Sequence, residues 1–256
     1  MTDIELIENY CKEGLGQGWL SEHSRASDIN SASFKPLNLD KVNLNNAILK
    51  RKRFPKVIIT NSDFSEADIS EAWLGMDAVL TGNNFSNANL SKTLVKCADF
   101  TGSNFTGANL SEIMFECSKL NNTIFRNVNL RGADLQRMNF INLNMQNSDF
   151  RKTRMNLTDF SGSKLNGSNF QNTYLPGVIF TNSDLSNVDF TGATFEGIIF
   201  DNSINLNGTI FNDTKFYECS FRGADLRYAQ LANIKADQST TLAGSKRTLK
   251  QKLFGF

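Results

Sequence analysis

Residues 98–112 read ADFTG SNFTG ANLSE, which is one five-residue unit repeated three times. Each unit holds a small residue, an Asp or Asn, a Phe or Leu centre and two further residues, the last of which is most often Gly or Asn. The centres keep this spacing over residues 29–74, 80–200 and 206–236, with one extra residue at each of the two breaks. Of the 21 phenylalanines, 19 fall on these centres. So regular a pattern predicts a repeat architecture.

A period of five matches neither a helix nor a plain strand, so each unit must contain a turn. The small residue and the centre lie two positions apart and therefore point to the same side of an extended segment, which must be the interior. The Asp or Asn between them points outward. The last slot favours residues that tolerate a positive φ, as a type II turn requires. Different turns are expected where that slot holds another residue type, at Lys92, Cys97, Glu112, Cys117, Arg137, Lys152 and Leu157.

Four units close one square coil, so centres about 20 residues apart should stack. At about 4.8 Å per coil, about ten coils make a rod on the order of 50 Å long. Large apolar side chains then fill its interior, and a row of buried, stacked rings is expected at Phe140, Phe160, Phe180 and Phe200.

Individual units carry a family resemblance. Residues 108–112 (ANLSE), 133–137 (ADLQR), 183–187 (SDLSN) and 224–228 (ADLRY) resemble the pentapeptide-repeat family. The resemblance covers residues 27–236 and implies an all-β, right-handed quadrilateral β-helix. It leaves residues 1–26 as an N-terminal helical cap and residues 237–256 as a basic C-terminal cap or dimerisation segment.

The two ends of the chain differ from the repeats. Residues 2–13 are expected to be helical, since Thr2 and Glu5 have the spacing of a capping box and Gly14 and Gly16 follow. At the other end, apolar residues lie beside four cations: Leu242, Leu249, Leu253 and Phe254. This segment is expected to cap the last coil, to form a homodimer as the C-terminal segments of gyrase-protecting relatives do, or to bind a membrane surface.

Catalytic patterns find no support in this sequence. The one histidine, His23, precedes the repeats, so a Ser-His-Asp or Cys-His pair within the rod is excluded. Cys97 and Cys117 are too few ligands for a zinc site, and the glycines follow the repeat rather than a nucleotide-binding motif. We therefore expect that the protein is not an enzyme and that it binds neither a cofactor nor a metal ion. The two cysteines should lie within disulfide distance, yet we expect free thiols because the fold does not need a covalent cross-link to be stable.

A basic segment interrupts the early repeats at Lys50, Arg51, Lys52, Arg53 and Lys56. Lys52 falls in a small, inward slot, so a loop or bulge is expected in place of a turn. The segment is either a solvated irregularity or a docking site for an acidic partner or a nucleic acid.

Some outward slots are apolar. Trp73, Leu94 and Met114 should stack on consecutive coils of one face, and Ile58 and Val79 on the next. Such a ladder is either shielded by an N-terminal segment or forms a surface for a partner or for self-association. Farther along, a group of cations includes two that lie one coil apart, Arg131 and Arg151, together with Lys152 and Arg154. Asp134 is expected beneath Arg154. The group is either a solvated ladder or a binding patch.

Charge separates two functional hypotheses. Residues 57–236 carry 14 cations against 18 carboxylates, which is a weak negative charge for an imitation of duplex DNA. We therefore favour an interaction scaffold, a cellular adaptor or delivered effector that binds another, unidentified protein. The alternative is a DNA-mimicking protector of a type II topoisomerase, gyrase. We expect neither a nucleic acid partner nor a membrane-spanning segment. The absence of a cleavable signal peptide favours a location in the cytoplasm, with export by another route left open.

Overall fold

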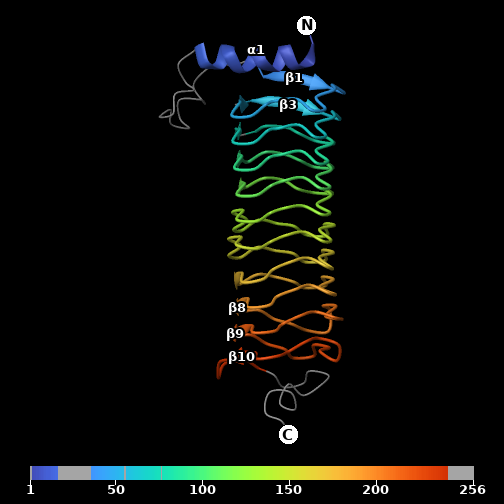
Figure 1. Ribbon diagram of the computed structural model, residues 1–256, viewed down its shortest axis with the longest axis vertical. Helices are drawn as coiled ribbons and strands as arrows, with labels where there is room; N and C mark the ends of the chain where they lie inside the picture. The colour runs from blue at the N-terminus through green and yellow to red at the C-terminus, as the bar shows by residue number, and fades with distance from the viewer. Residues whose placement is uncertain (1, 17–35, 55, 76, 242–256) are drawn as a thin grey trace.

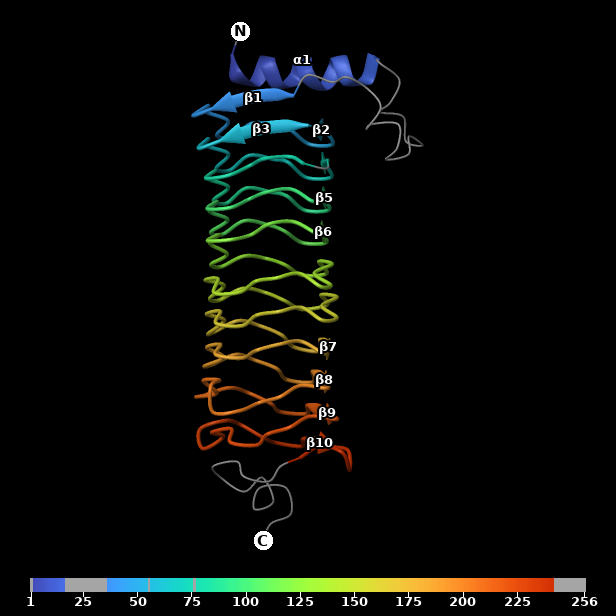
Figure 2. The same ribbon diagram turned by 180° about the vertical axis from the view of Figure 1, so that it is seen from behind.

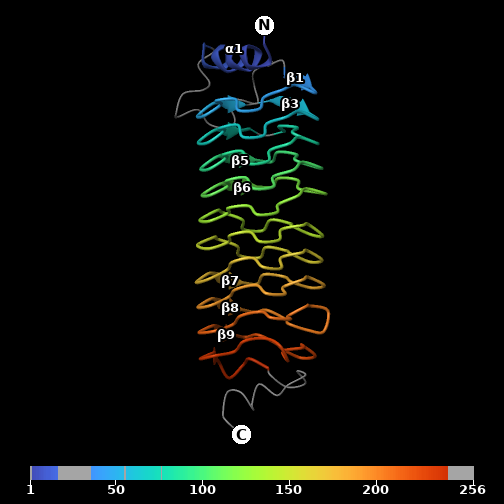
Figure 3. The same cartoon turned by 45° about the vertical axis from the view of Figure 1, so that its right-hand side comes forward.

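The computed structural model describes residues 2–16, 36–54, 56–75 and 77–241. The chain forms a rod of about ten coils, a right-handed quadrilateral β-helix with one short helix, as the repeat predicts. Helix α1 (Asp3–Gly16) lies across the N-terminal end of the rod (Figures 1 and 3). The helix ends three residues later than expected, and its predicted capping box is confirmed, because Thr2 and Glu5 bond each other's backbone N–H.

Each coil is bonded to the next through its backbone. In one such step, Phe160 N–H donates to Ile179 O at 2.8 Å and Ile179 N–H donates to Thr158 O at 3.0 Å. All strand pairings are parallel, with partners about 20 residues apart. The strands are β1 (Leu37–Asp40), β2 (Arg53–Phe54), β3 (Val57–Thr60), β4 (Trp73–Leu74), β5 (Leu94–Lys96), β6 (Met114–Glu116), β7 (Tyr174–Pro176), β8 (Thr194–Glu196), β9 (Lys215–Tyr217) and β10 (Lys235–Ala236).

The four sides of the rod are numbered here in chain order by their outward residues. In one coil, face 1 carries Asp99, face 2 Asn104, face 3 Asn109 and face 4 Met114. Strands β1 and β3 lie on face 1. All the others lie on face 4, where Figure 2 shows β5 to β10 in one column. Face 4 is therefore the most strand-like side of the rod.

Turn geometry differs from the expectation. All seven positions that lack Gly or Asn are nonetheless left-handed, with φ between 44° and 61°. At five of them a normal turn bond closes the corner, such as Thr153 N–H to Phe150 O at 3.3 Å, so the prediction of different turns is wrong there. At Cys97 and Cys117, which directly follow β5 and β6, the corner is a bend without that bond. The coil backbone thus dictates the turn, whatever side chain it carries.

The interior is filled by the centres. The rings of Phe140, Phe160, Phe180 and Phe200 are all buried, as predicted. Phe160 stacks on Phe140 at 5.3 Å and on Phe180 at 5.7 Å, but no stacked pair joins Phe180 to Phe200 among the described residues. Phe200 instead stacks on Phe221, at 4.7 Å between centroids.

Helix α1 covers the open N-terminal end of this core. The helix buries its own side chains Ile7, Tyr10 and Cys11 against this end, and the Tyr10 hydroxyl donates to Lys56 O at 2.7 Å. The end of the β-helix, where core and backbone would otherwise be exposed, is thereby closed. The part of the proposed cap that spans residues 17–26 lies outside the described residues.

Candidate interaction face

Face 4 departs from the repeat in its outward row. Faces 2 and 3 place mostly Asp or Asn there and face 1 does so at fewer than half of its positions, whereas only one of ten residues on face 4 is of that type. In order along the rod the row reads Arg53, Trp73, Leu94, Met114, Asp134, Arg154, Tyr174, Thr194, Lys215 and Lys235.

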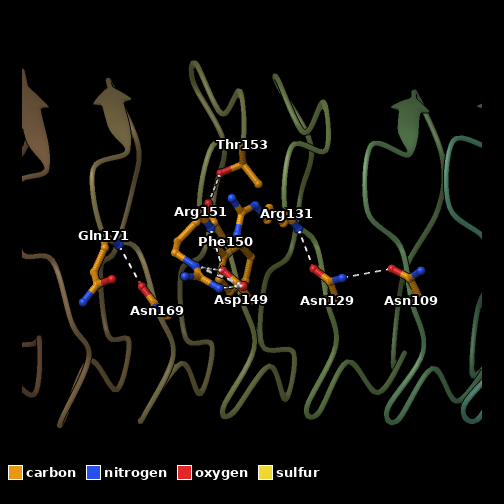
Figure 4. A network of polar contacts seen from close by, with 9 residues as sticks. All are labelled: Asn109, Asn129, Arg131, Asp149, Phe150, Arg151, Thr153, Asn169 and Gln171. Carbon is orange, nitrogen blue, oxygen red and sulfur yellow. Dashed lines mark hydrogen bonds and ion pairs between the residues drawn. The ribbon is translucent and has the colours of Figure 1, made fainter.

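Face 3 shows what the usual Asp and Asn residues do. Asn109 and Asn129 accept the N–H of the residue after the centre, and the Asn129 amide donates to Asn109 Oδ1 at 3.0 Å (Figure 4). These side chains close the turns locally and bond coil to coil. Their role is therefore structural, and a face without them has its outward positions available for other chemistry.

The corners that border face 4 also depart from the residue types that the repeat usually has. From Gly82 to Gly197 there are 24 left-handed corner positions, and half of them border face 4. All 12 positions away from face 4 are Gly or Asn, whereas seven of the 12 beside it are not: Lys92, Cys97, Glu112, Cys117, Arg137, Lys152 and Leu157.

This distribution has an energetic meaning. A left-handed conformation costs an ordinary L-residue roughly 1–2 kcal/mol, and Gly or Asn avoids most of that cost. Lys152 and Leu157 have φ of 61° and 56°, close to the 57° of Asn147 on a corner away from face 4. The φ angles therefore give no reason for the choice, and in this section of the rod unfavourable backbone conformations collect around face 4, whereas outside it Lys41 and Glu66 hold them on corners away from face 4. Such clustering is typical of functional surfaces.

The predicted apolar ladder lies on this face. Trp73 pairs with Leu94, and Leu94 pairs with Met114, on β4, β5 and β6. Met114 is 48% exposed, and the other two are half-buried. Ile58 and Val79 pair on adjoining face 1 and are also half-buried. The register of both rows is as predicted, and their role in partner binding stays a prediction.

A second apolar group escaped the sequence analysis. Tyr174 on face 4, Leu157 at its corner, and Ile179 and Ile199 on face 1 are all exposed. Ile179 and Ile199 occupy the same outward slot as Val79, farther along the same face, so the rule that located the first ladder would have found them. Leu157 is accommodated because Gly177 in the next coil leaves room for its Cδ2.

A charged section separates the two apolar groups. Arg154 pairs with Asp134 at 3.1 Å, which confirms that predicted contact. Arg151 forms a two-pronged ion pair with Asp149, beside Arg131 (Figure 4). Burial raises the pKa of Asp149, but the hydrogen bonds from Arg151 and the nearby charges outweigh it, so this pKa lies below its ordinary value.

The basic segment is regular over Lys50–Phe54, contrary to the expected loop or bulge. Lys52 N–H donates to Leu49 O at 3.2 Å in a normal turn, and β2 pairs with β4. Lys52 is tolerated because it lies in the first described coil, where its slot is only half-buried. Lys50 and Arg51 both pair with Glu71, at 3.3 and 2.7 Å. Arg53 continues the outward row of face 4 above Trp73, and Lys56 is half-buried beside it.

The prediction of two free thiols is wrong. Cys97 and Cys117 form a disulfide across neighbouring coils, with Cα atoms 4.6 Å apart. The distance agrees with the predicted register, but proximity alone did not indicate the oxidised state. The bridge lies at a corner of face 4, next to a Lys96–Glu116 ion pair of 3.6 Å. It ties together the two coils that carry Leu94 and Met114.

Other kinds of site have little support. Among the described residues, no group of three His, Cys, Asp or Glu side chains is arranged to hold a metal ion. An internal space in the first coils is lined by apolar side chains alone, so it has no polar group to orient a ligand. No described helix has the length and hydrophobicity to cross a membrane. Leu242, Leu249, Leu253 and Phe254 lie outside the described residues, so dimerisation through them stays a prediction.

Comparison with known proteins places the fold in context. The solved structure of HetL, involved in heterocyst differentiation regulation in the cyanobacterium Nostoc, is 19% identical and aligns over 84% of this chain and 92% of its own, with a TM-score of 0.41. A trypsin-treated variant of QnrB1, a plasmid-mediated fluoroquinolone resistance protein, is 17% identical over 81% and 93%, with a TM-score of 0.40. A protein of the Arabidopsis thaliana thylakoid lumen is 23% identical over 45% and 66%, with a TM-score of 0.24. No curated protein matches the sequence.

Family models match most of the rod. The model named pentapeptide repeat region matches residues 133–204, and the model named pentapeptide repeats (8 copies) matches residues 38–74, 96–132 and 202–235. Together they cover more than half of the chain and follow the same five-residue units as the coils. The chain therefore belongs to the pentapeptide-repeat family.

Proposed function

We propose that this protein is a non-catalytic interaction scaffold, a rigid rod that binds another protein through face 4 and its two bordering corners. The observation that carries the proposal is the confinement of unfavourable left-handed residues to those corners between Gly82 and Gly197. Side chains that weaken the fold, and that the turn does not need, are best explained by contact with a partner.

Surface chemistry supports the same face. Face 4 and the adjoining face 1 carry both apolar groups, whereas face 3 is largely an amide ladder. Exposed apolar rows framed by charges are typical of protein-binding surfaces. The coil-to-coil backbone bonds hold these rows in fixed register, so little conformational entropy is lost on binding. Whether the scaffold is a cellular adaptor or a delivered effector depends on its partner.

Gyrase protection is the competing function. It requires an acidic rod that enters a basic groove on the enzyme. Cations of face 4 such as Arg137, Lys152 and Arg154 interrupt the negative surface that this imitation needs. A supercoiling assay with the purified protein tests it directly. We expect no salt-sensitive protection of gyrase.

Site-specific photo-cross-linking tests the scaffold. Met114 and Ile124 lie in outward slots half a coil apart, on opposite faces, with 48% and 40% exposure. A photoreactive phenylalanine analogue is placed at each position in turn, in the native host. We expect a discrete cross-linked protein from position 114 and none from position 124. Equal products from both positions, or none from position 114, would refute the proposal.

A further inference from the structure

We infer that face 4, over residues 50–157, binds an acidic polypeptide segment that also carries apolar side chains. The inference rests on the proposed function and deepens it, because it names the chemistry of the partner. It starts from the distribution of charge around the rod.

Cations collect on this side of the rod. Between residues 50 and 157, the outward positions of face 4 and its corners hold 11 cations against five carboxylates. The cations are Lys50, Arg51, Arg53, Lys56, Lys92, Lys96, Arg131, Arg137, Arg151, Lys152 and Arg154. The carboxylates are Glu71, Asp77, Glu112, Glu116 and Asp134. The remaining outward positions of residues 37–160 have three cations, Lys41, Lys119 and Arg126, against seven carboxylates.

Several of these cations form no ion pair within the described coils, although Arg131 lies near the carboxylate of Asp149. Within the described coils, no carboxylate lies in ion-pair distance of the exposed side chains of Lys92, Arg131, Arg137 and Lys152. Arg137 and Lys152 also hold φ of 58° and 61°, where most corners have Gly or Asn. Exposed cations at unfavourable backbone positions complement the charge of an acidic partner and speed its association.

The mixture of groups favours a polypeptide over a nucleic acid. Duplex DNA presents a charge about every 1.7 Å along its axis, and the carboxylates Glu112, Glu116 and Asp134 would repel it. A polypeptide can place its carboxylates opposite individual cations. The row of Trp73, Leu94 and Met114 offers apolar contacts to side chains of the same segment.

The test uses a labelled random copolymer of glutamate and tyrosine, whose binding to the full chain is followed by fluorescence anisotropy. The variant Arg137→Asn/Lys152→Asn removes two cations from the corners of face 4. The matched control, Arg126→Asn/Lys164→Asn, removes two exposed cations on and beside face 2 that form no ion pair among the described residues. We expect the first variant to bind at least about tenfold more weakly at low salt and the control to change less than about twofold.

Two further measurements show whether weaker binding comes from lost charge contacts or from lost stability, and how much the aromatic side chains contribute to binding. Thermal unfolding of Arg137→Asn/Lys152→Asn should show a midpoint no lower than that of the parent, so weaker binding reflects lost contacts. Polyglutamate without tyrosine should bind the parent more weakly than the copolymer, and Met114→Gln should reduce that difference.

Three outcomes would overturn the inference: no binding of the copolymer at low salt, equal loss in both double variants, or tighter binding of a 20-base-pair duplex. If position 114 still cross-links one protein while the copolymer does not bind, the scaffold function stands and only the acidic character of its partner is refuted.

Discussion

Leu157 is a large apolar residue in a left-handed corner position, exposed to solvent at 53%. Asn147 has nearly the same φ on a corner that does not border face 4. The two positions allow the conformational cost to be measured in both directions. Because Asn tolerates this conformation, Leu157→Asn should raise the free energy of unfolding by about 1 kcal/mol, and Asn147→Leu should lower it by a similar amount. Chemical denaturation of both variants measures this, and destabilisation by Leu157→Asn would show that the side chain serves the fold.

Phe160 lies in the middle of the stacked core. It is fully buried, stacks on Phe140 and Phe180, and meets Phe150 edge-on at 5.7 Å. Replacement by Ala leaves a cavity that a coil fixed by backbone bonds cannot close. We expect Phe160→Ala to cost about 3–5 kcal/mol of unfolding free energy. An unchanged denaturation midpoint would contradict the assigned core.

At the scale of elements, the disulfide joins the coils of β5 and β6. Cys97 and Cys117 are 20 residues apart, so the bridge closes a loop in the unfolded chain. Loss of the bridge should lower the unfolding free energy by roughly 3 kcal/mol. Denaturation of Cys97→Ser/Cys117→Ser, beside the parent with and without reductant, measures the effect. Reductant should not alter the double variant, and a parent indifferent to reductant would contradict the stabilising role.

Helix α1 should respond to alkaline pH through Cys11. Burial raises the pKa of this thiol from about 9 to about 11. Because the folded state keeps this thiol protonated while the unfolded state ionises it, the free energy of unfolding is highest below about pH 9. That contribution is lost as the pH rises through about 11. Denaturation between pH 8 and 11 should therefore show a steeper loss of stability for the parent than for Cys11→Ala. Parallel pH profiles would show that the thiol does not titrate with unfolding.

At the scale of the whole molecule, the sequence predicts the coil and its register because one spacing governs every centre. Trp73, Leu94 and Met114 could be aligned across coils by counting alone. The conformations at Lys152 and Leu157 could not, because residue type suggested another turn while the backbone of neighbouring coils imposed the usual one. The oxidation state of Cys97 and Cys117 could not be predicted either, because a short Cα distance permits a disulfide but does not require one.

The candidate site lies at corners of the rod, and each corner residue borders a particular pair of faces. The sequence contains the seven exceptions, but their grouping around face 4 becomes visible only when the faces are defined. Five of them can be exchanged without touching the disulfide: Lys92, Glu112, Arg137, Lys152 and Leu157.

The role of these five residues in binding is tested by changing all of them to Asn together and measuring cross-linking to the partner from position 114. We expect the yield to be lost while the unfolding free energy rises by about 5 kcal/mol, about 1 kcal/mol for each position, because the variant relieves unfavourable conformations and removes contact side chains. A stabilised variant that still cross-links its partner with the parent's yield would contradict the claim that these residues are kept for binding.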